Sequence, residues 1–243
     1  MERTLIQVIA TMMVFLTLGF QPVFSQVEIT RAGCGTTKFC LEEPDKCNPA
    51  ANTTCLFGSG KATAFNSLTG IDLTFELSGN STGYIALGLT QNASVGPIML
   101  FACGQNSSSN GTFFFTTMTL DVNTTLTSLA RNMTGIQSSV VGENIKCKFS
   151  VSNLNATATA TALQTRANKD TTFQVVIGSG PLNGNTLGSF KLARNSESLD
   201  LSVFLPNSTT NTTAAPSGAN RPLYSNAVLP LLSFLTLSIL KFA

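Results

Sequence analysis

The sequence predicts an all-β fold, an immunoglobulin-type β-sandwich with a disulfide-rich segment at its N-terminal end. The clearest sign is an alternation in which Ile71, Leu73, Phe75 and Leu77 interleave with polar side chains. A period of two is typical of a strand with one buried and one solvated face. Short apolar runs then recur between Gly, Asn, Ser and Pro, and no stretch of comparable strength has helical periodicity. Regular short strands separated by turn residues indicate a sandwich.

The turn sequence Gly-Asn-Ser-Thr-Gly at 79–83 ends this first strand. Further strands are expected at Tyr84–Thr90, Ile98–Cys103, Thr112–Leu120, Ile136–Val141, Ile145–Val151, Thr171–Ile177, Ser189–Ala193 and Ser198–Leu205. The best helical candidate, Thr124–Arg131, is short enough to be one turn on a loop. The Ala-Thr run from Asn155 to Ala162 is compatible with a strand, because Thr favours extended backbone.

The N-terminal end resembles an export signal. Arg3 precedes an apolar stretch from Leu5 to Phe20, and Ser25 is a small residue suited to signal peptidase. We therefore expect residues 1–25 to be a signal peptide, with a buried helix or a membrane anchor as the weaker alternatives. The mature chain would then hold a cysteine-rich segment at 26–58 and the sandwich at 59–205.

Six cysteines follow the expected cleavage point: Cys34, Cys40, Cys47, Cys55, Cys103 and Cys147. An even number in an exported chain favours disulfides. A zinc site is disfavoured because the chain has no histidine and lacks closely spaced cysteine pairs. Cys103 and Cys147 suit a staple across the sandwich rather than a redox pair, whereas the first four cysteines allow three pairings.

Ten Asn-x-Ser/Thr sequons predict a heavily N-glycosylated surface. They start at Asn52, Asn80, Asn92, Asn106, Asn110, Asn123, Asn132, Asn155, Asn207 and Asn211. Each sequon that carries a glycan must lie at the surface.

The C-terminal end has the layout of a lipid-anchor signal. Residues 206–226 are rich in Ser, Thr, Asn and Pro and resemble a glycosylated stalk, with small residues near Ser217, the expected attachment point. An apolar tail at 227–243 follows. A membrane-spanning helix is the alternative, but it needs about 20 residues and is usually flanked by basic residues.

The charge balance and the kinds of titratable side chain present argue against some classes of function. Residues 26–217 hold 11 basic and 11 acidic side chains, so no basic surface supports nucleic-acid binding. Without histidine, acid–base catalysis lacks its usual group. Asp72 and Glu76 share a strand face, but we expect that face to be solvated. Phe113, Phe114 and Phe115 place aromatic rings on both sides of a strand, which favours core over a ligand groove.

The segment CGTTKFCLEEPDKCNPAANTTC, Cys34 to Cys55, resembles the cysteine-rich start of the ectodomain of the ferric-chelate reductase 1 (stromal-cell-derived receptor 2) family. TGYIALGLTQNASVGP, residues 82–97, is similar to the DOMON signature, and the resemblance continues more weakly to about residue 205. It implies a DOMON β-sandwich. Full-length members add a cytochrome b membrane domain whose histidines hold haem, which has no counterpart here.

Haem-binding DOMON domains use a Met from the turn after the signature strand and a His from a later strand. The best-matching turn position here is Val95, which cannot ligate iron, and Met99 lies in an expected core strand. The resemblance therefore does not extend to a haem site.

We expect a non-catalytic ectodomain on the outer face of the plasma membrane, held by a glycosylphosphatidylinositol (GPI) lipid anchor, which binds a small ligand or a surface protein. No catalytic, cofactor-binding or metal-binding residue is expected, and no nucleic-acid partner. The alternatives are a redox accessory or haem-binding relative of the reductases and a structural surface-coat glycoprotein; a single-pass or secreted form is the alternative to the anchor.

Overall fold

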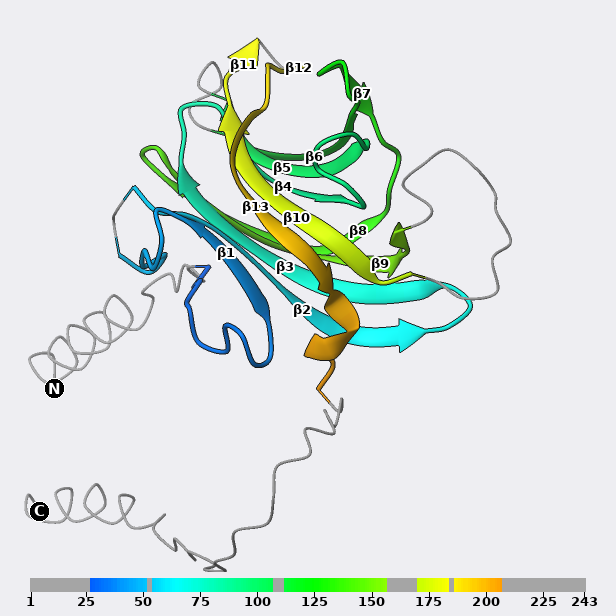
Figure 1. Cartoon of the computed structure of the whole chain (residues 1–243). Helices are drawn as coiled ribbons and strands as arrows, with labels where there is room; N and C mark the ends of the chain where they lie inside the picture. The colour runs from blue at the N-terminus through cyan, green and yellow to red at the C-terminus, as the bar shows by residue number, and fades with distance from the viewer. Residues whose placement is uncertain (1–26, 52–53, 107–111, 157–169, 184–185, 207–243) are drawn as a thin grey trace, which may run out of the picture. The chain divides into compact units, whose positions relative to one another are not determined.

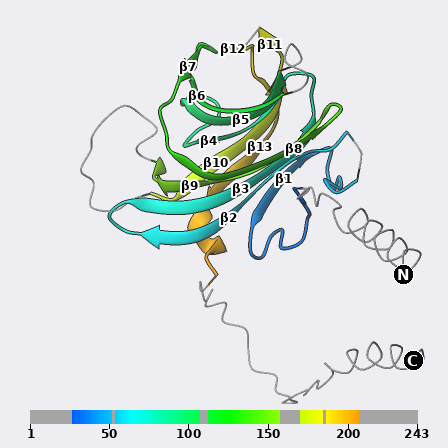
Figure 2. The same cartoon turned by 180° about the vertical axis from the view of Figure 1, so that it is seen from behind.

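Antiparallel strands make up most of the described part of the chain. The computed structural model describes residues 27–51, 54–106, 112–156, 170–183 and 186–206. Within them, the strands form a five-stranded sheet, a six-stranded sheet and a two-stranded hairpin. The two large sheets pack face to face (Figures 1 and 2), which confirms the predicted all-β sandwich. In these residues, no helix is long and apolar enough to cross a membrane.

The five-stranded sheet has the order β1-β2-β3-β9-β8, and each neighbouring pair is antiparallel. Its strands are β1 (Phe39–Glu43), β2 (Leu56–Asn66), β3 (Gly70–Asn80), β9 (Asn144–Leu154) and β8 (Met133–Val141). The alternation read from the sequence lies in β3, where Ile71, Leu73, Phe75 and Leu77 are at most 1% exposed.

The six-stranded sheet has the order β13-β10-β4-β5-β6-β7, also antiparallel throughout. Its strands are β13 (Lys191–Asp200), β10 (Thr172–Gly180), β4 (Tyr84–Thr90), β5 (Ile98–Asn106), β6 (Thr112–Leu120) and β7 (Leu126–Ser128). A short hairpin of β11 (Leu182–Asn183) and β12 (Thr186–Leu187) connects β10 to β13, and a 3₁₀ helix, η3 (Leu201–Phe204), follows β13.

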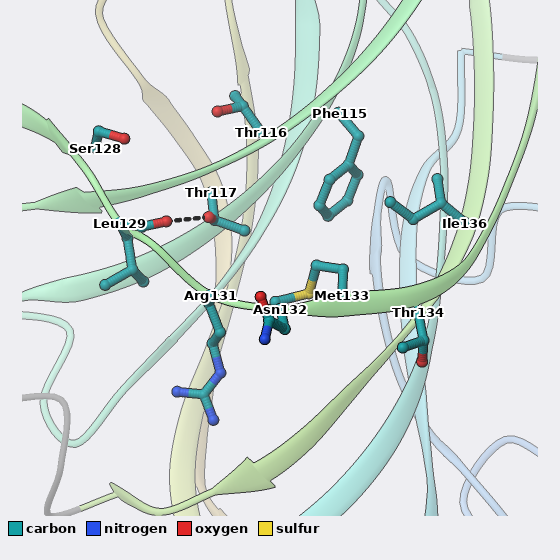
Figure 3. A pocket seen from close by; sticks show the side chains of 10 residues that line it. All are labelled: Phe115, Thr116, Thr117, Ser128, Leu129, Arg131, Asn132, Met133, Thr134 and Ile136. Carbon is teal, nitrogen blue, oxygen red and sulfur yellow. Dashed lines mark hydrogen bonds between the residues drawn. The ribbon is translucent and has the colours of Figure 1, made fainter.

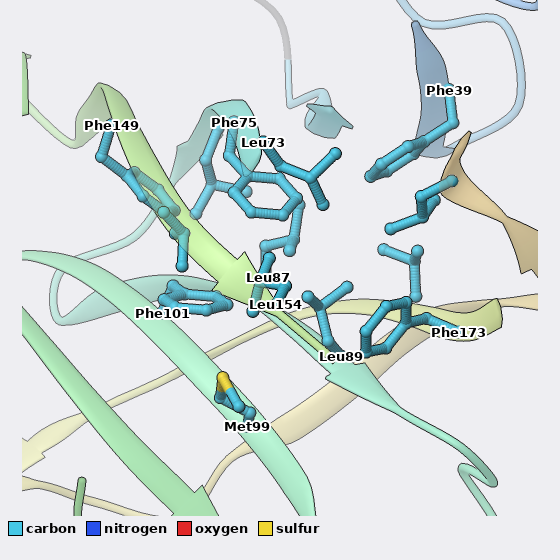
Figure 4. Close-up of a cluster of buried hydrophobic side chains, with 14 of the residues drawn as sticks. Phe39, Leu73, Phe75, Leu87, Leu89, Met99, Phe101, Phe149, Leu154 and Phe173 are labelled. Carbon is cyan, nitrogen blue, oxygen red and sulfur yellow. The ribbon is translucent and has the colours of Figure 1, made fainter. Parts of the chain in front are cut away.

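The main core lies between the two sheets (Figure 4). Phe75 and Phe149 come from the five-stranded sheet and Phe101 from the six-stranded one. Their ring centroids lie 5.4–5.6 Å apart. Aromatic pairs at this separation add about 0.5–1.5 kcal/mol each beyond the area that they bury. These rings therefore hold the two sheets together at the centre of the sandwich.

A second apolar cluster lies on the opposite face of the six-stranded sheet and includes Tyr84, Leu100 and Val176, all fully buried. It explains why β4 is buried along its whole length. The Tyr84 hydroxyl donates a hydrogen bond to the carbonyl of Gly188 at 3.0 Å, and burial raises the pKa of Tyr84 to about 12. The sheet thus packs against apolar side chains on both faces.

The three consecutive phenylalanines of β6 follow the same two-layer arrangement. Phe113 and Phe115 pack against the main core, whereas Phe114 packs in the second cluster. An added Cβ at Gly104 would lie 2.3 Å from the Phe114 ring, so glycine is what lets this ring lie flat against β5. The rings agree with the expected strand between two layers, although all three remain partly exposed.

All six cysteines form disulfides, which confirms the disulfide prediction. The Cys103–Cys147 bond joins β5 to β9 and therefore staples the two sheets. The pairing that the sequence left open is Cys34–Cys40 and Cys47–Cys55. These two short loops fold the N-terminal segment over Phe57, forming a small cluster with Val27, Ile29 and Cys55.

The N-terminal segment changes the environment of Glu76, which we expected on a solvated face. Lys38, only 8% exposed, donates a hydrogen bond from Nζ to the Glu76 carboxylate at 2.8 Å and another to the carbonyl of Thr30 at 2.7 Å. Ser59 Oγ also donates to this carboxylate, at 3.1 Å. Glu76 is half-buried because a segment remote in sequence covers it.

Two further expectations differ from the structure. The strands expected at Ser189–Ala193 and Ser198–Leu205 are one strand, β13, followed by η3. Ser196 Oγ accepts a hydrogen bond from the amide of Val175 at 2.9 Å where the register shifts, so the chain stays paired across a turn-like sequence. The helical candidate Thr124–Arg131 contains β7 instead of a helix. Most of the Ala-Thr run, 157–162, lies outside the described residues.

Candidate functional site

The two flanks of the sandwich, where the edge strands of the sheets meet, differ in how they are sealed. We call the flank formed by β1 and β13 the closed flank. There, Arg194 pairs with Glu43 at 3.3 Å and with Asp45, and the rings of Phe39 and Phe204 are in edge contact with centroids 6.2 Å apart. The opposite flank, formed by β6, β7 and β8, holds a pocket, and we call it the open flank.

The pocket of the open flank, the lateral pocket, has a volume of about 600 Å³ and opens to solvent (Figure 3). This lies within the range of pockets that hold small ligands, about 300–1,000 Å³. Its lining combines apolar side chains, hydroxyl groups, one amide and one guanidinium. The residues are Phe115, Thr116, Thr117, Ser128, Leu129, Arg131, Asn132, Met133, Thr134 and Ile136.

Local sequence explains why the wall on the β7 side is short. The Asp121 carboxylate accepts hydrogen bonds from the backbone amides of Asn123 at 2.9 Å and Thr125 at 2.7 Å, which closes a tight turn after β6. The strand β7 then has only three residues before the chain crosses to β8. The six-stranded sheet therefore ends early here and leaves the edge of the main core uncovered.

A bulge shapes the wall on the β8 side. The register of β8 against β9 shifts between Thr134 and Gln137, and Gly135 has a φ of 63°, a conformation that favours glycine. Such bulges redirect a side chain. The residue that follows Gly135 is Ile136, which is 43% exposed and lines the pocket.

The apolar part of the lining is continuous with the main core. Phe115, Leu129 and Met133 are partly buried against that core and also line the pocket. The Phe115 ring contacts the ring of Phe149 with centroids 4.8 Å apart. The pocket therefore has a fixed apolar floor rather than a floor of loose surface side chains.

Arg131 is the one charged residue of the lining, and its guanidinium is already engaged. Nη2 donates hydrogen bonds to the carbonyls of Ser152 and Asn153, each at 2.9 Å. Nε is buried without a hydrogen-bond partner, and burial lowers the pKa of Arg131. Figure 3 shows the guanidinium pointing away from Phe115 and Ile136. Arg131 thus ties the β7–β8 connection to β9, and it remains the one positive charge in the lining of the pocket.

The remaining polar groups suit binding more than chemistry. The Thr117 hydroxyl donates to the carbonyl of Leu129, and the hydroxyls of Thr116, Ser128 and Thr134 complete the polar lining. None of the ten lining residues is a carboxylate, thiol or amine that would serve as a nucleophile or general base. Among the described residues, no group of three or more His, Cys, Asp or Glu side chains could hold a metal ion.

The residues weighed for chemistry in the sequence do not come together. The Asp72 carboxylate accepts a hydrogen bond from the amide of Asn153 at 2.8 Å, and Glu76 pairs with Lys38, so both carboxylates have structural partners. Met99 is 6% exposed in the main core (Figure 4), whereas Val95 is 68% exposed in the turn between β4 and β5. None of the four lines the lateral pocket.

The predicted glycosylation sites occupy different environments. Asn80, Asn92, Asn123 and Asn132 are exposed, and Asn106 is half-buried. Asn155 is only 7% exposed, and its side-chain oxygen accepts a hydrogen bond from the amide of Asp170 at 3.1 Å. A glycan on Asn155 would require this segment to open. Asn52, Asn110, Asn207, Asn211 and the expected anchor residue Ser217 lie outside the described residues.

Sequence reasoning missed the pocket itself. Its lining comes from β6 and from a continuous stretch that runs from the end of β7 to the start of β8, and these two parts lie apart in sequence. Two local signals were the ligand groove weighed for Phe113–Phe115, of which Phe115 lines the pocket, and Gly135, which follows the sequon at Asn132 and precedes Ile136. A glycine in a strand often marks a bulge.

Two curated proteins are similar to the chain, and both carry the name "Putative ferric-chelate reductase 1". The protein from Danio rerio is 30% identical over 130 residues, which is 54% of this chain and 22% of the relative. The protein from Xenopus laevis is 33% identical over 72 residues, 30% of this chain and 11% of the relative. No protein-family model matches the chain. The chain is therefore related to ferric-chelate reductase 1 over about half its length, and the match spans only a small part of either relative.

Proposed function

We propose that the chain is a non-catalytic cell-surface glycoprotein whose DOMON-type β-sandwich binds a small ligand in the lateral pocket. The observation that carries the proposal is the mixed apolar and hydroxyl lining of this pocket. It offers a fixed apolar floor of Phe115, Leu129 and Met133, surrounded by hydroxyl groups, while the single guanidinium is turned to β9. Apolar walls with a few polar groups are typical of small-molecule sites.

The proposed location rests on sequence features. The N-terminal apolar segment supports export, the sequons support passage through the secretory pathway, and the apolar tail after Ser217 supports a GPI anchor in the outer leaflet. Release of the protein from intact cells by a phosphatidylinositol-specific phospholipase tests the anchor. Retention after this treatment would favour a spanning helix.

Ligand binding is tested by screening neutral aromatic and aliphatic compounds for saturable binding to the purified protein, produced with and without its N-glycans. Ile136→Gln is the informative variant, because Ile136 is exposed and lines the pocket. Val141→Gln is the matched control on the same strand, since Val141 is 64% exposed and outside the pocket. We expect Ile136→Gln to weaken binding and Val141→Gln to leave it unchanged. Equal effects of the two variants would contradict the proposal.

A redox role is the second candidate, and the name of the two relatives favours it. In this role the chain would bind haem or assist a separate membrane reductase. A visible absorption spectrum of the purified protein separates the two functions. A Soret band with stoichiometric iron would overturn the non-catalytic proposal, whereas a featureless spectrum together with saturable ligand binding supports it.

A further inference from the structure

The sequon at Asn132 passes through the lateral pocket. Asn132 and Thr134, its first and third residues, both line the pocket, and both side chains are exposed. The middle residue, Met133, contributes to the apolar floor. None of the other described sequon asparagines, Asn80, Asn92, Asn106, Asn123 and Asn155, lines this pocket. A sugar attached to Asn132 would therefore start inside the pocket rather than at its rim.

The lining also matches the chemistry of the first sugar of an N-linked glycan. N-acetylglucosamine is uncharged and has an apolar ring face and methyl group beside its hydroxyl and amide groups. Phe115, Met133 and Ile136 offer apolar surface for the ring face and the methyl group of the sugar. The hydroxyls of Thr116, Thr117 and Ser128 can form hydrogen bonds with its hydroxyl and amide groups. The guanidinium of Arg131 donates hydrogen bonds to carbonyls of β9, so it is directed away from the apolar floor.

Position on the fold restricts where this sugar can go. Asn132 lies just before β8, on the connection that crosses from β7, and Gly135 starts the bulge three residues later. The pocket therefore borders the residue that would carry the glycan. In contrast, Asn123 is in the exposed turn between β6 and β7, outside the lining of the pocket.

We infer that an N-glycan on Asn132 gates the lateral pocket: its first sugar lies over the apolar floor of the pocket, and only chains without this glycan expose that floor to ligand. The inference rests on the proposed function, because it names the regulation of the same site. Apolar side chains that would otherwise face water are covered in the glycosylated form. Occupancy of one sequon then sets the fraction of molecules able to bind.

The experiment uses the full chain expressed in cells that make only high-mannose glycans, with Asn132→Gln and Asn123→Gln as matched variants. Mass spectrometry first gives the occupancy of each site. Endoglycosidase H is then applied to the native and to the denatured protein. We expect the Asn132 glycan to be trimmed about tenfold more slowly than the Asn123 glycan in the native protein, equivalent to about 1.4 kcal/mol of protection. After denaturation the two rates should be equal.

A neutral fluorescent probe, N-phenyl-1-naphthylamine, measures access to the pocket. We expect saturable binding to the wild-type sequence made with N-glycosylation blocked and to Asn132→Gln, and weaker binding to the glycosylated wild-type chain and to Asn123→Gln. Absence of a glycan at Asn132, or equal native trimming rates at the two sites, would overturn the gate. A third outcome is slow trimming at Asn132 while no variant binds the probe or any compound of the screen. It would show that the sugar packs in the pocket, but it would refute both the proposed ligand site and its regulation.

Discussion

The closed and open flanks of the sandwich join the same two sheets, yet only one of them is sealed. On the closed flank, β1 and β13 are bridged by Arg194 and by the contact between Phe39 and Phe204. On the open flank, β7 has three residues and β8 carries a bulge, so the main core reaches the surface at Phe115 and Met133. We therefore expect the closed flank to contribute more to stability than the open flank, which carries the proposed binding site.

The largest expected effect comes from breaking the closed flank at Phe39. This ring is 4% exposed and contacts both Phe75 and Phe204. Truncation of a buried Phe leaves a cavity, so Phe39→Ala should lower the free energy of unfolding by about 3–5 kcal/mol. Denaturant unfolding measures this, and Ile136→Ala on the open flank is the comparison, with an expected loss below about 1 kcal/mol. Similar losses for the two variants would show that the flanks are equally important for stability.

The inter-sheet staple should give the next effect. Cys103 and Cys147 are 44 residues apart and both fully buried. Their replacement by alanine in a double variant should destabilise the fold by about 2–4 kcal/mol, because the unfolded chain regains the freedom that the loop removed. Removal of Cys47–Cys55, which closes only 8 residues, should cost less. The order of the two melting temperatures checks the prediction, and a reversed order would contradict it.

The sandwich could be predicted from the sequence because the side-chain alternation and the turn residues agree with the way in which the strands pack. The alternation in β3 and the bounds of β4 and β6 follow from side-chain pattern and turn residues, and all three lie where expected. The sequence could not predict the cover over Glu76, because Lys38 comes from a segment 38 residues away. The sequence also predicted two strands in place of β13, because Asn195 and Ser196 are typical turn residues. Only the structure shows that Ser196 accepts a hydrogen bond from the amide of Val175. The pocket joins two stretches that lie apart in sequence, 115–117 and 128–136, so local patterns alone did not predict it.

The Glu76–Lys38 pair makes stability depend on pH. Burial by itself would raise the pKa of Glu76, but hydrogen bonds from Lys38 and Ser59 and the charges of Lys38 and Lys148 outweigh it, so this pKa lies below its ordinary value of 4.5. A lowered carboxyl pKa stabilises the fold above the unfolded-state pKa, and this contribution is lost as the pH falls through the folded-state pKa.

Glu76→Gln should therefore lower the free energy of unfolding at pH 7 by about 1.5–3 kcal/mol, typical of a hydrogen bond to a charged group. The difference from wild type should shrink as the pH falls below 4.5, where Glu76 of the unfolded chain takes up a proton, and it should be lost once the pH falls below the lowered pKa of the folded protein. Urea unfolding of both proteins from pH 7 to pH 3 measures it. If the difference in the free energy of unfolding stays constant over this range, the charge of the Glu76 carboxylate does not contribute to stability.

The ion pair on the closed flank should have the smallest effect. Side chains of Arg194 and Glu43 are 37% and 47% exposed, so water and salt screen their attraction. We expect a coupling free energy below about 1 kcal/mol in a double-mutant cycle of Arg194→Ala and Glu43→Ala. A larger coupling would mean that ion pairing, rather than aromatic contact, seals this flank.

The central claim is that the lateral pocket binds a ligand, and methionine methyl resonances test it most directly. Met133 lines the pocket, whereas Met99 lies in the main core and Met118 packs against the second cluster. We would label the methionine methyl groups with ¹³C in the Asn132→Gln protein and titrate N-phenyl-1-naphthylamine. The Met133 resonance should shift with saturation while those of Met99 and Met118 stay in place. An unmoved Met133 resonance, or equal shifts at all three methionines, would contradict the claim.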